Sequence, residues 1–137
     1  MTTECSLRVR TYECDMYGHV NNAIYLNYLE YARYEYLRDI GFDFPAITLA
    51  GYGIFVARIE IDYKTPARTD DDLTIKTWPI KTGAVSGALG QEIRRGGELL
   101  IKARVTWAFV NAKTGAPVKI PKEWDLPGLH PGKREKP

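Results

Sequence analysis

The sequence predicts an α+β fold, in which one long apolar helix packs against a sheet of about five mostly antiparallel strands. Residues 23–40 contain neither glycine nor proline, and apolar side chains recur there at a helical period. Residues 55–64 and 99–109 instead alternate with a period of two, which is typical of strands. The Arg-Gly-Gly-Glu run at 95–98 predicts a tight hairpin, because glycine adopts the positive φ that such a turn needs.

A strand and a polar loop precede the helix. Residues 5–12 largely alternate charged with less polar side chains and predict a strand with one solvated face. Residues 15–22 follow as a polar loop. Asn21 or Asn22 is expected to cap the helix, because an asparagine side chain accepts hydrogen bonds from the free amides of a first turn. Gly41 is expected to end the helix.

The rest of the chain is predicted to be mainly β-structure. Residues 42–53 contain a proline and two glycines, and we expect a loop there. Four strands in meander order are then predicted at 55–64, 73–82, 86–94 and 99–109, with a short strand piece at 117–121. One helix covers only one face of such a sheet. Apolar residues expected on the other face, such as Val56, Trp78 and Val110, predict self-association.

Length and composition limit the class of protein. The chain has 137 residues, and we expect a single domain over 1–126 and a flexible basic tail over 127–137. The net charge is +2 and is concentrated in that tail, which argues against nucleic-acid binding. Cys5 and Cys14 lack the spacing of a zinc site, so no metal is expected. Neither a signal peptide nor a membrane span is predicted, which favours a cytoplasmic location.

The loop before the helix is the candidate site. It places Asp15, His19, Asn21 and Asn22 within eight residues, directly ahead of an apolar helix. A helix start offers free N–H groups and a positive dipole end, which a developing oxyanion needs in acyl transfer. A nearby carboxylate can attack a carbonyl or activate water. The same residues also fit an ordinary loop, in which asparagine caps the helix and Asp15 and His19 bond turn amides.

A family resemblance favours the chemical interpretation. The run from Asp15 to Arg33, with Gly-His-Val-Asn-Asn at 18–22, resembles the signature of the 4-hydroxybenzoyl-CoA thioesterase-like branch of hotdog-fold proteins. The resemblance continues at 59–68 and 107–110 and covers roughly residues 6–121. The 18–22 motif is similar to that of long-chain acyl-CoA and plant-type acyl-carrier-protein thioesterases. A second subgroup has a histidine where this chain has Asn22.

The resemblance implies a hotdog fold and hydrolysis of an acyl-CoA thioester to a free acid and CoA, without a cofactor. Asp15 would be the nucleophile or the general base, and the backbone N–H near Asn22 would polarise the thioester carbonyl. His19 would orient the loop or assist proton transfer, and Asn21 would hold the loop. Tyr25 would line the acyl pocket or pack in the core. Family members form homodimers or homotetramers with active sites at the subunit boundary.

Three other interpretations stay open. The protein could bind acyl-CoA without turnover, although the expected carboxylate, Asp15, is present. It could act on acyl-carrier-protein thioesters, or be a hotdog dehydratase, which usually depends on a catalytic histidine; apart from His19 the sequence offers only His130. Cys14 could be a nucleophile, but His19 is the only base near it in the sequence.

Overall fold

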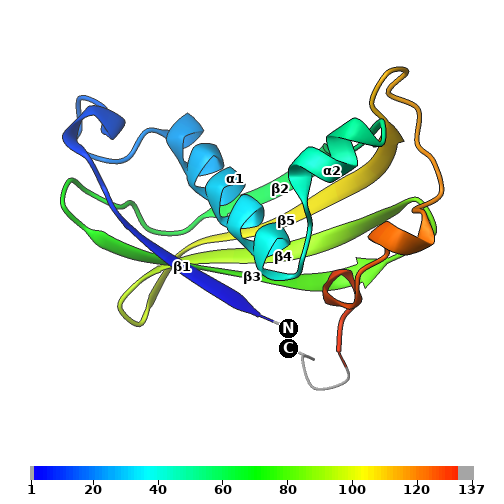
Figure 1. Cartoon of the computed structure of the whole chain (residues 1–137). Helices are drawn as coiled ribbons and strands as arrows, with labels where there is room; N and C mark the ends of the chain where they lie inside the picture. The colour runs from blue at the N-terminus through cyan, green and yellow to red at the C-terminus, as the bar shows by residue number, and fades with distance from the viewer. Residues whose placement is uncertain (1, 133–137) are drawn as a thin grey trace.

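The computed structural model describes residues 2–132 and contains a five-stranded antiparallel sheet with one long helix lying across a single face (Figure 1). The predicted α+β class is therefore confirmed. The strands are β1 (Thr3–Arg8), β2 (Tyr52–Tyr63), β3 (Asp72–Thr82), β4 (Ser86–Arg95) and β5 (Glu98–Asn111), and the helices are α1 (Asn22–Asp39) and α2 (Phe44–Leu49). Short 3-10 turns occupy Thr11–Glu13, Lys122–Trp124 and Pro127–Leu129. Within residues 2–132, no helix combines the length and the hydropathy needed to cross a bilayer.

The strand order is β1-β3-β4-β5-β2, which differs from the predicted meander. Strands β3, β4 and β5 do form consecutive hairpins, and Gly96 has the expected positive φ of 61°. Strand β2, however, pairs with β5 at one edge, while β3 lies beside β1 near the other edge. Residues 64–71 connect β2 to β3 across the sheet. Hydrogen bonds to the N-terminal part of the chain hold this connecting segment. Ala67 O accepts a hydrogen bond from Val20 N, and Asp71 O accepts one from Val9 N.

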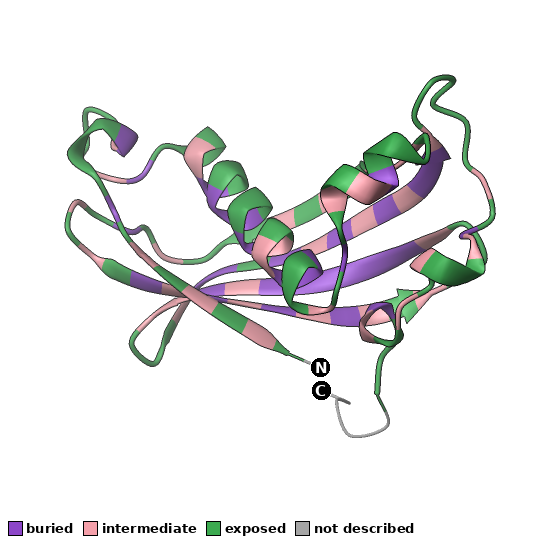
Figure 2. Ribbon diagram, in the orientation of Figure 1, coloured by how far each residue is buried: buried purple, intermediate pink, exposed green. Residues whose placement is uncertain are grey.

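Helix α1 begins and ends where the sequence indicates. Asn21 is the N-cap, and its Oδ1 accepts a hydrogen bond from Ala23 N at 2.9 Å. The helix ends before Gly41, which has a φ of 105°. One face is buried against the sheet, whereas the other is open in the single chain (Figure 2). Leu26, Tyr31 and Tyr34 remain exposed there, so the sheet does not wrap the helix as fully as its apolar character suggests.

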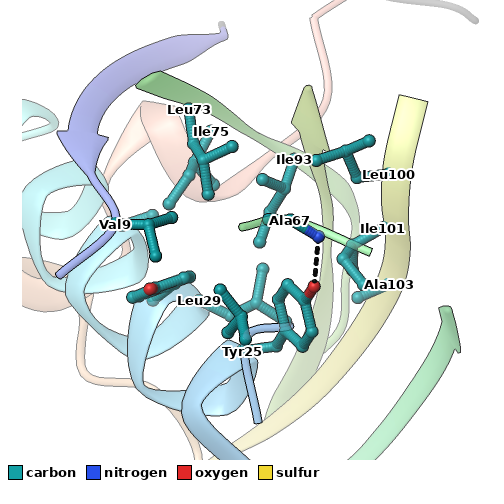
Figure 3. Packing of buried hydrophobic residues seen from close by; sticks show 13 residues of the cluster. Val9, Tyr25, Leu29, Ala67, Leu73, Ile75, Ile93, Leu100, Ile101 and Ala103 are labelled. Atoms are coloured by element: carbon teal, nitrogen blue, oxygen red, sulfur yellow. Dashed lines mark hydrogen bonds between the residues drawn. The ribbon is translucent and has the colours of Figure 1, made fainter. Parts of the chain in front are cut away.

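The core has two parts. The first lies between the N-terminal half of α1 and the sheet (Figure 3). It contains Tyr25 and Leu29 from α1, together with Ile75, Ile93 and Ile101 from three neighbouring strands. The second part surrounds the C-terminal half of α1 and includes residues of α2, β5 and the C-terminal segment. The first part supports the start of α1, where the candidate site lies.

Two predicted loop segments carry more structure than expected. Residues 42–53 include α2, whose N-cap Asp43 accepts a hydrogen bond from Ala46 N at 3.1 Å. The chain also remains packed beyond residue 126, because Leu129 is buried and Tyr36 donates its hydroxyl hydrogen to Gly128 O. The packed chain thus continues at least to Leu129. Residues 133–137 of the predicted tail lie outside the described residues.

Candidate active site

The Asp15 loop is a compact turn whose hydrogen bonds fix the carboxylate. Asp15 N donates to His19 O at 2.8 Å, and Gly18 N donates to Asp15 O at 3.0 Å. Gly18 has a φ of 76°, a conformation that glycine adopts without strain. The Oδ1 atom of Asp15 accepts from Tyr17 N at 2.8 Å and from His19 N at 3.3 Å. Within residues 2–132 no hydrogen bond reaches Oδ2, so one carboxylate oxygen is anchored and the other is available to a reactant.

One buried alanine joins this loop to the helix. Ala67 O accepts from Val20 N at 2.9 Å, and Ala67 N donates to the Tyr25 hydroxyl at 2.9 Å (Figure 3). Both backbone groups of Ala67 are therefore used, and its side chain is fully buried. Burial raises the pKa of Tyr25, and the hydrogen bond from Ala67 N opposes that rise. These bonds place the loop, the segment after β2 and the start of α1 around a common centre.

The start of α1 leaves the Asn22 amide without a hydrogen-bond partner among the described residues. Asn21 N donates to Glu13 O at 2.9 Å, Ala23 N donates to Asn21 Oδ1, and Ile24 N donates to Asn21 O at 2.9 Å. Among the described residues, no acceptor is within hydrogen-bonding distance of Asn22 N. First-turn amides carry the positive end of the helix dipole. Asn22 N–H is consequently a donor at this helix start that remains open to a ligand oxygen.

These groups surround a pocket of about 260 Å³. Its wall is formed by residues from the loop, the helix start and the end of β2: Asp15, His19, Val20, Asn22, Tyr25, Tyr63, Lys64, Thr65 and Pro66. The structure thus brings together four of the five residues that the sequence indicated. Asn21 is the exception, because it is not part of the wall and its side chain is engaged as the helix cap.

Tyr63 and Lys64 belong to the wall but were not identified as site residues from the sequence. They lie in the 59–68 run, which the sequence marked only as part of the fold. Its similarity to the family was the signal that could have drawn attention to them. Tyr25 packs in the core and also forms part of the wall of this pocket.

Two alternative chemical groups lie elsewhere. Cys14 is absent from the pocket wall, and its Sγ lies 3.3 Å from the Thr69 hydroxyl oxygen. His130 is paired through Nε2 with Asp125 Oδ1 at 2.6 Å in the C-terminal segment. The one histidine in the pocket wall is His19, whose burial is intermediate.

A second, more apolar pocket of about 150 Å³ lies farther along α1. Its wall includes Leu37, Trp107 and Val56, with Glu30 and Arg33 among the polar members. Arg33 donates to Gln91 Oε1 at 3.2 Å, and burial lowers the pKa of its guanidinium while the negative charge of Glu30 opposes this. Arg33 is eleven residues beyond Asn22, or about 16 Å along a helix that rises 1.5 Å per residue.

Comparisons with known proteins agree with this architecture. The family model for the thioesterase-like superfamily matches residues 9–126. The long-chain acyl-CoA thioesterase FadM of Escherichia coli is 34% identical over 81% of this chain and 85% of its own length. The acyl-CoA thioesterase YbgC of Haemophilus influenzae is 34% identical over 86% of this chain and 89% of its own.

Other similarities are shorter or structural. The chloroplastic acyl-acyl carrier protein thioesterase ATL3 of Arabidopsis thaliana is 34% identical over 53% of this chain, and the match spans only 38% of that relative. The crystal structure of a probable thioesterase from Bartonella henselae superposes with a TM-score of 0.81 at 31% identity, covering 88% of this chain and all of that one. On its sequence and its five-stranded hotdog fold, the chain belongs to the thioesterase-like superfamily.

Proposed function

We propose that this protein hydrolyses an acyl-CoA thioester to a free carboxylic acid and CoA. The observation that carries the proposal is the joint position of the Asp15 carboxylate and the free Asn22 amide in one pocket wall. Membership of the thioesterase-like superfamily and the similarity to FadM and YbgC support the same activity.

In the proposed reaction, the thioester carbonyl oxygen accepts a hydrogen bond from Asn22 N–H. The positive end of the α1 dipole then stabilises the negative charge that develops on this oxygen. Asp15 either takes a proton from an attacking water molecule or attacks the carbonyl carbon itself. In both routes the carbon–sulfur bond breaks, its electron pair goes to sulfur, and CoA leaves as a thiolate.

His19 and Asn21 have supporting parts in the proposal. His19 N bonds the carboxylate of Asp15 and so orients it, while the His19 ring contributes to the same pocket, where it can assist proton transfer. Asn21 holds the first turn of the helix through its cap. The reaction needs no cofactor, because the carboxylate, water and backbone amide supply all of its steps.

The size of the pocket bears on the acyl carrier. A volume of about 260 Å³ is below the range of about 300–1,000 Å³ that is typical for whole drug-sized ligands. We therefore propose that only the thioester end enters, while the rest of the carrier lies outside. Such a pocket admits the thioester end of either an acyl-CoA or an acyl carrier protein, and the relative ATL3 is an acyl-acyl carrier protein thioesterase.

Self-association forms part of the proposal. Strand β2 is an edge strand, and the exposed side of α1 carries Leu26, Tyr31 and Tyr34. Phe55 and Val56 on β2 are exposed as well. An edge strand and an apolar helix face left open together favour pairing with a second copy, so we propose a homodimer or homotetramer.

Cys5 and Cys14 are free thiols, which fits a reducing cytoplasmic location.

The proposal is tested by measuring thiol release from a panel of acyl-CoAs with short, long and aromatic acyl groups. Wild type should turn over at least one substrate class. Asp15→Asn removes the carboxylate and should lower kcat by about 10² or more, the scale of a lost general base or nucleophile. Asp39→Asn, the same change at an exposed aspartate at the far end of α1, should leave kcat unchanged.

Two results would redirect the proposal. Binding of acyl-CoA without thiol release by wild type would replace hydrolysis with a binding function. Faster release from acyl carrier protein thioesters than from the matching acyl-CoAs would change the carrier but keep the reaction.

A further inference from the structure

Tyr63 makes an unusual connection between the sheet and the start of α1. It is the last residue of β2, where its Cα is opposite that of Ile101 in β5. Its hydroxyl group donates a hydrogen bond to Asn22 O at 3.2 Å, although 41 residues separate the two in the sequence. Asn22 is the first residue of α1 and the one whose N–H group is free.

The ring of Tyr63 is supported by a second tyrosine. Its centroid is 5.6 Å from that of Tyr25, and the two planes meet at 63°. The hydroxyl of Tyr25 is in turn occupied by Ala67 N. Ring packing therefore sets the direction of the Tyr63 hydroxyl toward the helix, while both tyrosines remain in the pocket wall.

The first turn of α1 needs such an anchor. Ala23 N and Ile24 N donate to the side chain and the carbonyl group of Asn21. These two acceptors belong to the residue just before the helix, so they do not tie the turn to the sheet. The bond from Tyr63 fixes the same turn to a strand of the sheet. An amide that stabilises an oxyanion must keep its direction to within a fraction of an ångström, because misplacement weakens its stabilisation of the transition state.

We propose that Tyr63 is a positioning residue for catalysis, which holds the Asn22 N–H group at the angle needed to stabilise the oxyanion. This inference rests on the proposed thioester hydrolysis. Tyr63 bonds the carbonyl of the Asn22–Ala23 peptide, which is joined at the Asn22 Cα to the Asn21–Asn22 peptide that carries the free N–H. It takes no part in bond making or breaking. Its contribution therefore belongs to the transition state, and the loss of its hydroxyl should lower kcat much more than it changes KM.

Tyr63→Phe tests this directly, because it removes the hydroxyl and keeps the ring against Tyr25. Tyr12→Phe is the control: Tyr12 is exposed, it is not part of the pocket wall, and within residues 2–132 its hydroxyl makes no hydrogen bond. We expect Tyr63→Phe to lower kcat about 3- to 10-fold, the effect of one modest hydrogen bond, with KM within about twofold of wild type. Tyr12→Phe should match wild type in both constants.

A second readout is independent of activity. If the hydroxyl anchors the first turn, hydrogen exchange at Ala23 and Ile24, followed by NMR, should be at least about 3-fold faster in Tyr63→Phe and unchanged in Tyr12→Phe. A kcat within twofold of wild type, a loss carried by KM, or unchanged exchange would each overturn the inference. Absence of thiol release by wild type would instead contradict the proposed hydrolysis, and the exchange data would still decide whether Tyr63 holds the helix start.

Discussion

Replacing Asn21 by alanine should destabilise the protein through the first turn of α1. In the native structure Asn21 Oδ1 accepts the hydrogen of Ala23 N at 2.9 Å. Alanine offers no acceptor, so Ala23 N–H would have only water as a partner. Because both residues are exposed, water can reach this amide, and the cost should be that of a lost helix cap rather than of a buried unpaired donor.

A lost asparagine cap costs about 1 kcal/mol of unfolding free energy. For a chain of 137 residues this corresponds to a fall in Tm of about 4 °C. Asn21→Ser should keep most of the stability, because a serine hydroxyl also caps helices well. The difference between the alanine and serine variants thus isolates the hydrogen bond from the loss of the asparagine side chain itself.

Urea unfolding followed by circular dichroism gives the unfolding free energy, and a thermal melt followed in the same way gives Tm. The alanine variant should unfold at a lower midpoint with an unchanged slope, whereas the serine variant should unfold close to wild type. Equal losses in the two variants would refute the assignment of the effect to the cap. No loss in either would show that Asn21 does not stabilise the start of α1.

Two further perturbations probe the packing. A Cβ atom at Gly90 would overlap the indole ring of Trp78 on the neighbouring strand. Gly90→Ala should therefore lower the unfolding free energy, measured by urea titration, by about 1–3 kcal/mol. Gly97→Ala, with open space around the added methyl group, should be nearly neutral in the same titration. Burial raises the pKa of Tyr36 to about 12, and its pKa in the unfolded chain is about 10. The unfolded state therefore loses this proton first, so the Tyr36 contribution is intact below pH 10 and falls by about 1 kcal/mol per pH unit between pH 10 and 12. Tyr36→Phe should flatten the pH dependence of stability in that range, and an equally steep fall in the variant would contradict the assignment.

Local pattern was enough to predict α1 and the five strands but not how the strands pair. The helix is recognisable because residues 23–40 combine a helical period with Asn21 before them and Gly41 after them. Alternation likewise identifies β2, yet alternation is the same whichever strand lies beside it. Its pairing with β5 depends on the path of residues 64–71, which is set by hydrogen bonds to distant backbone atoms such as Val20 N.

Short or irregular segments were harder to predict. Helix α2 is only six residues long, too short for a periodic signal, and Pro45 in its first turn resembles a loop residue. The C-terminal segment is rich in proline and charge, which concealed the large side chains that pack on the core there, namely Trp124, Leu126 and Leu129. In both cases tertiary contacts decide the structure, and these leave little trace in nearby sequence.

The candidate site likewise combines residues that the sequence could place together with residues that it could not. Asp15, His19 and Asn22 are close in sequence, so a compact loop was enough to predict that they share a region. Tyr63 and Lys64 reach the pocket only because the end of β2 folds back beside the helix start. The chemical roles of these residues stay predictions, which the variants above are designed to test.

The strand order also constrains how the chain can fold as it leaves the ribosome. Strand β1 pairs with β3, which begins at Asp72, and β2 pairs with β5, which extends to Asn111. A nascent chain that ends after β2 thus holds a helix and two strands with no strand partner between them. Its apolar helix must wait for later residues, and such unpaired strands are prone to aggregate. Synthesis of β5 is consequently the step after which the whole sheet, and with it the pocket beside β2, can assemble.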